Sequence, residues 1–120
     1  MGRGRGIKVF YKNISWVYET KSHVTMCLVE SLMFMTKRND AEIVFNSNTR
    51  RELAKRFGTS PVSISRSLSE LIKHGVIARK LGEDGNVEYN HFILNPRMYW
   101  FGDVQCRKNA MKKYGHLFGY

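Results

Sequence analysis

The sequence predicts an α+β fold that is mainly α, with a small antiparallel sheet. Two capped helix patterns, "TRRELAKRF" and "SPVSISRSLSELIK", stand on either side of one glycine. Two strand-like runs, "VIARKL" and "NVEYNHFIL", follow them and are joined by "GEDG". An apolar stripe at helical spacing lies upstream, within "KSHVTMCLVESLMFMT". A chain of 120 residues with 42% hydrophobic residues can bury one modest core of this kind.

The chain before the helix pair is predicted to hold a tail, a helix and a strand. "MGRGRG" is typical of a flexible basic tail, because three glycines and two arginines cannot form a core. Residues 7–20 fit both helical and strand spacing, and we favour a short helix after an extended entry. Residues 21–36 are predicted as a helix that Thr20 or Ser22 caps, and residues 41–46 as a short strand.

The first helix of the pair is predicted to begin at Thr49. Glu52 follows three residues later, which is the spacing of a capping box. Gly58 ends the helix, because glycine readily takes the left-handed conformation after a last turn. The residues expected on its buried face are Leu53, Ala54 and Phe57.

The second helix is predicted to begin after Ser60, whose hydroxyl can cap it, with Pro61 at the first helical position. Gly75 ends it. A step of about 100° per residue divides the helix into two faces. The residues expected to face inward are Ile64, Leu68, Leu71 and Ile72. The residues expected to face outward are Val62, Arg66, Ser69 and Lys73.

In the following hairpin, Asp84–Gly85 favours a two-residue type I′ turn. That loop length would pair Ile77 with Phe92 and Val76 with Ile93. The strand upstream of the helix pair would complete a three-stranded sheet. The order helix, strand, helix, helix, strand, strand predicts a winged helix-turn-helix.

The charge distribution points to a polyanionic partner. Twenty Lys and Arg against ten Asp and Glu give a formal charge of +10. Residues 50–80 hold eight basic and two acidic residues, a net charge of +6. Nucleic acid is therefore the first candidate partner. A membrane is not expected, because the longest apolar stretch, "VTMCLVESLMFM", is too short to span a bilayer. With no secretory signal recognisable, the expected location is the cytoplasm.

The second helix is expected to enter the major groove of double-stranded DNA, which is wide enough to admit a helix. Arg66 is expected to read a base, because its guanidinium can donate two hydrogen bonds to guanine. The residues predicted to face bases are Pro61, Val62, Arg66 and Ser69. The residues predicted to bind phosphates are Arg50, Arg51, Lys55, Arg56, Thr59, Ser60, Ser63, Lys73, Arg79 and Lys80. The acidic hairpin tip "GEDG" argues against insertion of this tip into a minor groove.

We divide the chain into three parts. Residues 1–6 are a flexible basic tail, and residues 7–96 are a winged helix-turn-helix DNA-binding domain. Residues 97–120 are a basic C-terminal extension, which we expect to be helical and packed on the domain. A homodimer is left open. Two alternative interpretations are left open. The charged helix face is merely solvated, or the winged helix binds another protein.

Catalysis, a metal and a cofactor are not expected. The four histidines lie far apart in the sequence, and with Cys27 and Cys106 they form no zinc-ligand spacing. No two histidines stand two residues apart, so the metal pair of rolling-circle nickases is missing. "GRGRG" lacks the lysine and the Ser/Thr of a phosphate-binding loop. The sequence therefore predicts a binding protein and not an enzyme.

Two family resemblances extend this interpretation. "RRELAKRFGTSPVSISRSLSELIKHGVIARK" resembles helix-turn-helix segments of bacterial regulators of the Crp type. On that match Pro61, Val62 and Arg66 fall on base-facing positions, and Ser60 and Ser63 on phosphate-facing ones. Over a longer range, roughly residues 10–118, the chain resembles the RepL family of plasmid replication proteins. The segment "FILNPRMYWFGD" and the basic tail after it carry this second resemblance.

The longer resemblance implies a protein of plasmid replication initiation or copy maintenance. Such a protein would bind an origin and recruit host replication proteins without cutting DNA. The alternatives are a winged-helix transcription regulator, such as an autorepressor, and a basic protein that coats nucleic acid with little sequence preference. The aromatic run Tyr99–Phe101 is expected to pack under the helix at residues 21–36, in preference to stacking on bases.

Overall fold

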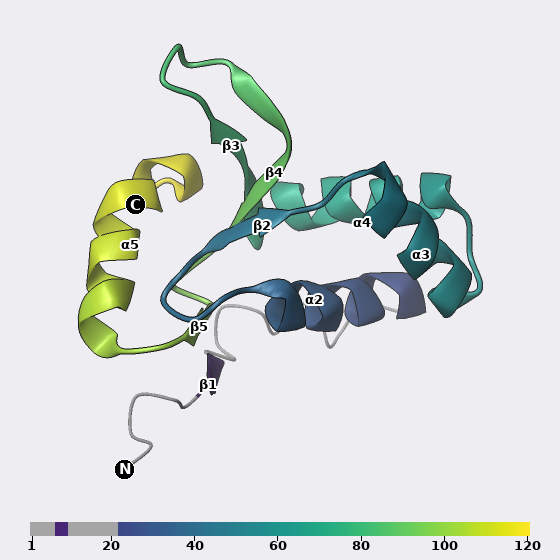
Figure 1. The fold of residues 1–120 in the computed structure, drawn as a ribbon, viewed down its shortest axis with the longest axis horizontal. Coiled ribbons are helices and arrows are strands. Elements are labelled where there is room, and N and C mark those ends of the chain that lie inside the picture. Colours follow the sequence, from purple (N-terminus) through teal and green to yellow (C-terminus); the bar gives the residue numbers. More distant parts are fainter. Residues whose placement is uncertain (1–6, 10–21) are drawn as a thin grey trace.

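The computed structural model describes residues 7–9 and 22–120 (Figure 1). Its elements run in the order β1 (Ile7–Val9), α2 (His23–Met35), β2 (Glu42–Val44), α3 (Ser47–Phe57), α4 (Pro61–Lys73), β3 (Ile77–Leu81), β4 (Val87–Leu94), β5 (Tyr99–Phe101) and α5 (Val104–Phe118). From α2 to β4 this is the predicted order, so the α+β winged helix-turn-helix is confirmed. The short helix expected within residues 10–20 lies outside the described residues.

Helix α2 packs beneath α3 and α4 and begins at one of its two predicted caps. The Ser22 hydroxyl oxygen accepts a hydrogen bond from the backbone N–H of Thr25 at 3.2 Å. The helix ends at Met35, and the hydroxyl of Thr36 donates to the carbonyl of Met33 at 2.7 Å. Its buried residues include Leu28, Val29 and Leu32, which belong to the main core.

Helix α3 begins earlier than predicted. Its N-cap is Asn46, whose side-chain oxygen accepts a hydrogen bond from the backbone N–H of Thr49 at 2.9 Å. The prediction that Thr49 caps the helix in a capping box with Glu52 is therefore wrong. Asparagine caps at least as well as threonine, and the earlier start adds helical residues ahead of Thr49. Gly58 ends the helix at a φ of 69°, as predicted.

The sheet has the order β2–β4–β3 and is antiparallel throughout, which confirms the predicted three strands. Its two faces bury different partners. Ile43 and Phe92 are register partners and belong to the main core beneath the helices. Ile93, the next residue along β4, packs on the opposite face with Trp100 and Ala110. Helix α5 covers that second face, so the sheet lies between two helical layers (Figure 1).

The β3–β4 hairpin has a different register from the predicted one. Ile77 lies opposite Leu94, and Ala78 lies opposite Ile93. The predicted pairs that this register excludes are Ile77–Phe92 and Val76–Ile93. The observed partners are two residues further along β4, so β4 holds more residues than β3 between the turn and the hairpin base.

The turn also differs from the predicted one, although by itself it would place Ile77 opposite His91 and not further along β4. The backbone N–H of Gly85 donates to the carbonyl of Gly82 at 2.9 Å, so Glu83 and Asp84 are the central residues of the turn. Gly85 follows with a φ of 82°. A type I′ turn centred on Asp84–Gly85 would need a positive φ at Asp84, which is not observed. The type I′ prediction is therefore wrong, and the loop has three residues.

A bulge in β4 produces the observed register, because its three extra residues move the partner of Ile77 from His91 to Leu94. Between the last regular pair at the hairpin base and the first pair near its tip, β3 has one residue, Lys80, and β4 has four, residues 88–91. Asn90 lies in this bulge with a φ of 67°, a left-handed conformation that asparagine tolerates better than most residues. Bulges of this kind bend a strand and redirect its side chains.

Strand β5 pairs with β1 and carries aromatic residues into both cores. Tyr99 packs in the main core and hydrogen-bonds with Thr36 at the end of α2. Trp100 packs instead with α5, and its indole N–H donates to the carbonyl of Asp103 at 3.0 Å. The expected packing under α2 is thus confirmed for Tyr99 and wrong for Trp100. Both rings are buried and unable to stack on bases.

A tight corner holds the start of α5 against the sheet. Asn39 has a φ of 61°, and its side-chain oxygen accepts a hydrogen bond from the backbone N–H of Asp103 at 2.9 Å. Gly102 has a φ of 141°, and a Cβ there would collide with the Asn39 side chain. Asp103 in turn caps α5 by accepting from the backbone N–H of Cys106 at 2.9 Å.

Candidate nucleic-acid interface

The turn between α3 and α4 is short and internally hydrogen-bonded. The backbone N–H of Thr59 donates to the carbonyl of Ala54 at 2.8 Å, which closes the end of α3. Ser60 caps α4 by accepting from the backbone N–H of Ser63 at 3.2 Å, and Pro61 occupies the first turn, both as predicted. Local hydrogen bonds therefore fix the turn between the two helices.

Helix α4 has one buried and one exposed face. The predicted inward residues Ile64, Leu68 and Leu71 are buried. Ser67 is also buried, and its hydroxyl oxygen accepts a hydrogen bond from the hydroxyl of Thr25 in α2 at 3.1 Å. The residues predicted to face bases, Pro61, Val62, Arg66 and Ser69, are all exposed, as is Lys73. A step of about 100° per residue places Val62, Arg66, Ser69 and Lys73 on the side of α4 that points away from α2, whereas Pro61 is exposed because it begins the helix.

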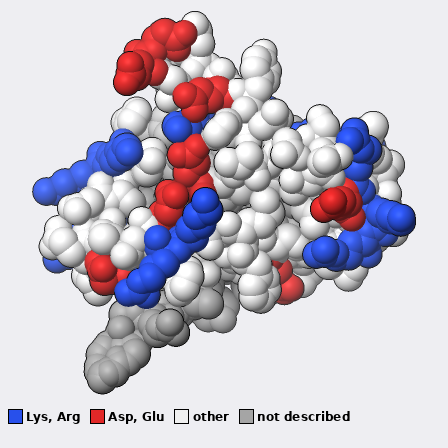
Figure 2. Space-filling model, in the orientation of Figure 1, with Lys and Arg blue, Asp and Glu red and all other residues white. Residues whose placement is uncertain are grey.

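The basic side chains of α3 lie beside this surface. Lys55 and Arg56 are exposed, and Arg51 donates to the side-chain oxygen of Asn48 at 2.6 Å. Arg50 is half-buried, with its guanidinium carbon 5.6 Å from the centre of the Phe45 ring. Its Nε is buried and has no hydrogen-bond partner among the described residues. Figure 2 shows the basic side chains gathered at the α3 end of the molecule.

The hydroxyl groups predicted to bind phosphate lie at the start of α4. Ser60 is exposed, whereas Thr59 and Ser63 are half-buried. The hydroxyl of Ser60 donates to the hydroxyl oxygen of Ser63 at 3.2 Å. Because the first backbone N–H groups of a helix also point in this direction, the start of α4 favours an anion.

The two basic residues predicted at the base of the hairpin lie in different surroundings. Arg79 is exposed, with its guanidinium carbon 5.5 Å from the centre of the Phe92 ring. Lys80 lies between two carboxylates, 3.1 Å from Glu42 and 3.3 Å from Glu88. Hydrogen bonding to Glu42 raises the pKa of Lys80, with a smaller contribution from Glu88. The positive charge of Lys80 is therefore already neutralised by carboxylates within the fold.

Glu42 is the centre of this ion-paired group. Its carboxylate also contacts Nδ1 of His91 at 2.7 Å. Burial alone would raise the pKa of Glu42, but hydrogen bonds from His91 and Lys80 outweigh burial and hold it below the usual range. Glu42, Glu88 and His91 offer ligand atoms within 4.8 Å of one another, a spacing that a metal ion could use. The ammonium group of Lys80 already supplies positive charge there.

The hairpin tip is acidic, as the sequence indicated. Glu83 and Asp84 are exposed at the turn, and Figure 2 shows their end of the molecule as acidic. Hydrogen bonds from the backbone and side chain of Asn86 lower the pKa of Asp84. This carboxyl group therefore stays charged to a lower pH than an ordinary aspartate does, and it would repel a phosphate backbone.

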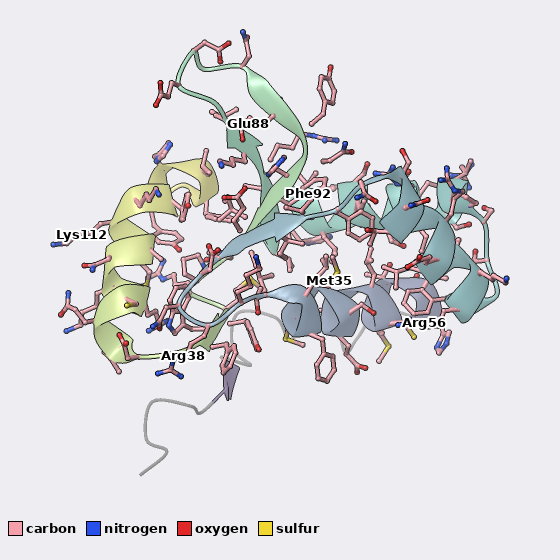
Figure 3. All side chains as sticks on the ribbon, viewed as in Figure 1. Met35, Arg38, Arg56, Glu88, Phe92 and Lys112 are labelled. Carbon is pink, nitrogen blue, oxygen red and sulfur yellow. The ribbon has the colours of Figure 1, made fainter. Side chains whose placement is uncertain are left out.

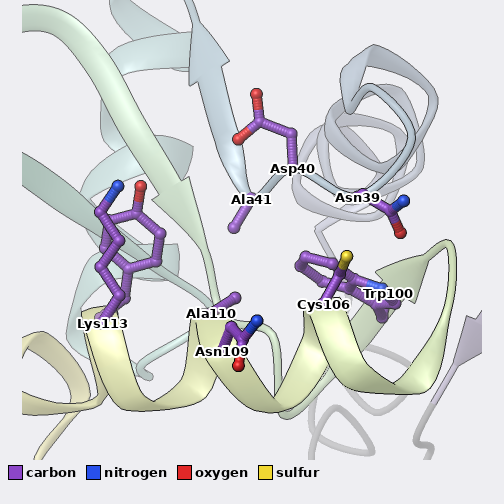
Figure 4. Close-up of a pocket in the computed structure, with 9 residues that line it drawn as sticks. Asn39, Asp40, Ala41, Trp100, Cys106, Asn109, Ala110 and Lys113 are labelled. Atoms are coloured by element: carbon purple, nitrogen blue, oxygen red, sulfur yellow. The ribbon is translucent and has the colours of Figure 1, made fainter.

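A cavity of about 220 Å³ lies between α5 and the start of β2 (Figure 4). Its lining residues are Asn39, Asp40, Ala41, Trp100, Cys106, Asn109, Ala110, Lys113 and Tyr114. Small side chains at Ala41 and Ala110 leave this space where α5 meets the sheet. The cavity lies on the α5 face of the sheet, so it is not part of the surface formed by α3 and α4.

Sequence reasoning did not reveal how the arginines are held. The phenylalanines beneath Arg50 and Arg79 are themselves in contact, with ring centres 6.3 Å apart and planes nearly perpendicular. The guanidinium groups of Arg50 and Arg79 thus pack on one pair of aromatic rings, which joins α3 to the hairpin. Nothing in the sequence signals this arrangement.

The Crp-like helix-turn-helix domain family matches residues 28–88, which is just over half of the chain. This range runs from within α2 into β4 and contains the whole helix pair. Neither the curated proteins nor the solved structures contain a match to the chain. None of the helices described is both long and apolar enough to cross a membrane.

Proposed function

The chain belongs to the Crp-like helix-turn-helix domain family, and from this premise we propose that it binds double-stranded DNA sequence-specifically through the outer face of α4. The observation that carries the proposal is the exposure of Arg66, Val62 and Ser69 together on that face. A helix of this size fits the major groove, where each base pair presents a distinct pattern of donors and acceptors.

Each part of the surface has a role in this proposal. Arg66 donates two hydrogen bonds to guanine, and Val62 contacts a thymine methyl group. The phosphate contacts come from the remaining predicted residues and position the helix without specifying sequence. They are Arg50, Arg51, Lys55, Arg56, Thr59, Ser60, Ser63, Lys73 and Arg79. Lys80 is left out of this set, because Glu42 and Glu88 already hold its ammonium group.

The finer proposal is that the DNA site is a plasmid replication origin and that the protein acts in replication initiation or copy maintenance. It is supported by the resemblance to RepL-type proteins, which extends past the helix pair through "FILNPRMYWFGD". Host replication proteins would be its further partners. A transcription regulator that uses the same surface, such as an autorepressor, is the second candidate, and it is favoured by the family match alone.

A footprint of the purified protein across its parent replicon, at two salt concentrations, tests these proposals. Several protected repeats in one region outside promoters support the initiator. One symmetric protected patch over a promoter supports the autorepressor, and with it a homodimer. Uniform protection that disappears at the higher salt concentration overturns sequence-specific binding, because a basic coating protein binds in that way.

A further inference from the structure

The bulge in β4 presents an aromatic side chain that the fold does not use. Tyr89 lies within the bulge and is 82% exposed. Within the part of the chain that the structure describes, its hydroxyl makes no hydrogen bond. The backbone of the neighbouring residue Asn90 is held by the fold, because its carbonyl accepts a hydrogen bond from the N–H of Phe45 at 2.6 Å. The bulge is therefore anchored, while the ring of Tyr89 projects from it.

That anchor places the bulge beside the start of α3. Phe45 is followed directly by Asn46, the N-cap of α3. The same Phe45 supports the guanidinium of Arg50, and its partner Phe92 supports that of Arg79. The bulge is thus linked, through Phe45 and Phe92, to the two arginines that these rings support. Figure 3 shows Phe92 between Glu88 in the hairpin and Arg56 at the far end of α3.

The hairpin and the outer face of α4 project to the same side of the molecule. Helix α2 packs beneath α4, and the β3–β4 hairpin rises on the side away from α2 (Figure 1). The exposed residues of α4 also point away from α2, because Ser67 on the opposite side of the helix contacts Thr25. A duplex seated on α4 would therefore have the flank of the hairpin beside it.

We propose that Tyr89, with Asn90, forms a second DNA contact on the sugar–phosphate backbone that flanks the groove occupied by α4. This inference rests on the proposed function. The ring of Tyr89 packs against a deoxyribose, and its hydroxyl donates to a phosphate oxygen. The wing thus contacts DNA with the flank of β4, and the acidic residues Glu83 and Asp84 at its tip stay clear of the backbone. The bulge takes Tyr89 out of the regular strand pairing and so frees its side chain for this contact.

The test uses the full chain and a duplex that it selects from a pool of randomised DNA. Hydroxyl-radical footprinting then maps which deoxyriboses the protein protects. For Tyr89→Ala we expect the central protection to remain, the protection of the flank to disappear, and Kd to rise roughly ten-fold. Tyr89→Phe should keep the flank protection, because the ring remains, and should bind less tightly than the native protein because the hydroxyl donor is lost.

The salt dependence of binding separates this contact from a charged one. Tyr89 is neutral and releases no counterion, so Tyr89→Ala should leave the slope of log K against log salt unchanged. Arg79→Ala should lower that slope by about 0.9, if its guanidinium neutralises one phosphate. Phe34→Ala is the matched control, because Phe34 is 85% exposed on α2, away from the proposed surface. This variant should bind as the native protein does.

The outcomes distinguish the two proposals. Unchanged flank protection and unchanged Kd in Tyr89→Ala, beside a clear native footprint, would overturn the contact at the bulge and leave DNA binding by α4 in place. A native protein that selects no sequence and protects no duplex would overturn the proposed function, and the contact at the bulge with it. Equal losses in Tyr89→Ala and Phe34→Ala would also overturn the contact.

Discussion

Replacement of Arg66 with alanine isolates the proposed base contact. Arg66 is exposed and makes no hydrogen bond or ion pair with the described part of the chain, so the free energy of unfolding should change by less than about 0.5 kcal/mol. In the complex, a guanidinium that donates two hydrogen bonds to guanine contributes about 1–3 kcal/mol of discrimination. This corresponds to a rise in Kd for the selected duplex of about 5- to 160-fold.

Fluorescence anisotropy with two labelled duplexes measures this effect. One duplex carries the selected sequence, and the other has the same base composition in scrambled order. Arg66→Ala should weaken binding to the selected duplex and change binding to the scrambled duplex much less. Arg56→Ala, the matched control from the phosphate-binding set, should weaken both by the same factor. Equal losses on both duplexes in Arg66→Ala would refute the assignment of Arg66 as a base reader.

Three further predictions concern stability, measured by urea unfolding. Leu68→Ala should lower the free energy of unfolding by about 2–5 kcal/mol, because Leu68 is 3% exposed in the core. Val62→Ala, at a 61% exposed position of the same helix, should change it by less than about 0.5 kcal/mol. Equal effects of the two substitutions would contradict the assignment of a buried and an exposed face to α4. Asn46→Ala should cost about 1 kcal/mol through loss of the cap, and Thr49→Ala should cost less; the reverse order would restore Thr49 as the cap. Because the fold lowers the pKa of Glu42, its carboxylate stabilises the folded state fully at pH values above the ordinary carboxyl pKa. This stabilisation is lost progressively as the pH falls below 4.5. Glu42→Gln should reduce that loss, and an unchanged acid sensitivity would count against the ion-paired group.

The helix pair could be predicted from sequence because its signals are local. The cap at Ser60, the proline after it and the glycine at position 58 each fix one backbone conformation within a few residues. The start of α3 could not be predicted as well, because Asn46 and Thr49 are both good caps and only the end of β2 decides between them.

The hairpin register depended on a feature with a weak sequence signal. An Asp-Gly pair favours a type I′ turn, but the four residues of β4 opposite Lys80 shift the strands against each other. Asn90 can adopt the required left-handed conformation, yet asparagine also occurs in regularly paired strands, so its presence alone does not predict a bulge. The neutralisation of Lys80 was likewise hidden, because Glu42 lies 38 residues away in the chain.

Val62, Arg66, Ser69 and Lys73 are exposed on one face of α4, which the sequence could predict because helical periodicity alone determines it. The packing of Arg50 and Arg79 on aromatic rings was not predictable, since it depends on the contact between Phe45 and Phe92 across the sheet. In physical terms, the sequence specified which residues face outward, and the tertiary packing specified how rigidly they are held.

The division of the core by the sheet bears on how the protein unfolds. Among the residues that the structure describes, the cluster beneath α5 has four buried residues, Ala41, Ile93, Trp100 and Ala110, whereas the cluster shared by the other helices has sixteen. Helix α5 should therefore detach first, and native-state hydrogen exchange should show it opening while the amides of α4 remain protected. In that open state Ile93 and Trp100 become exposed on an otherwise folded molecule. Aggregation would then begin from a form in which the helix pair is still intact.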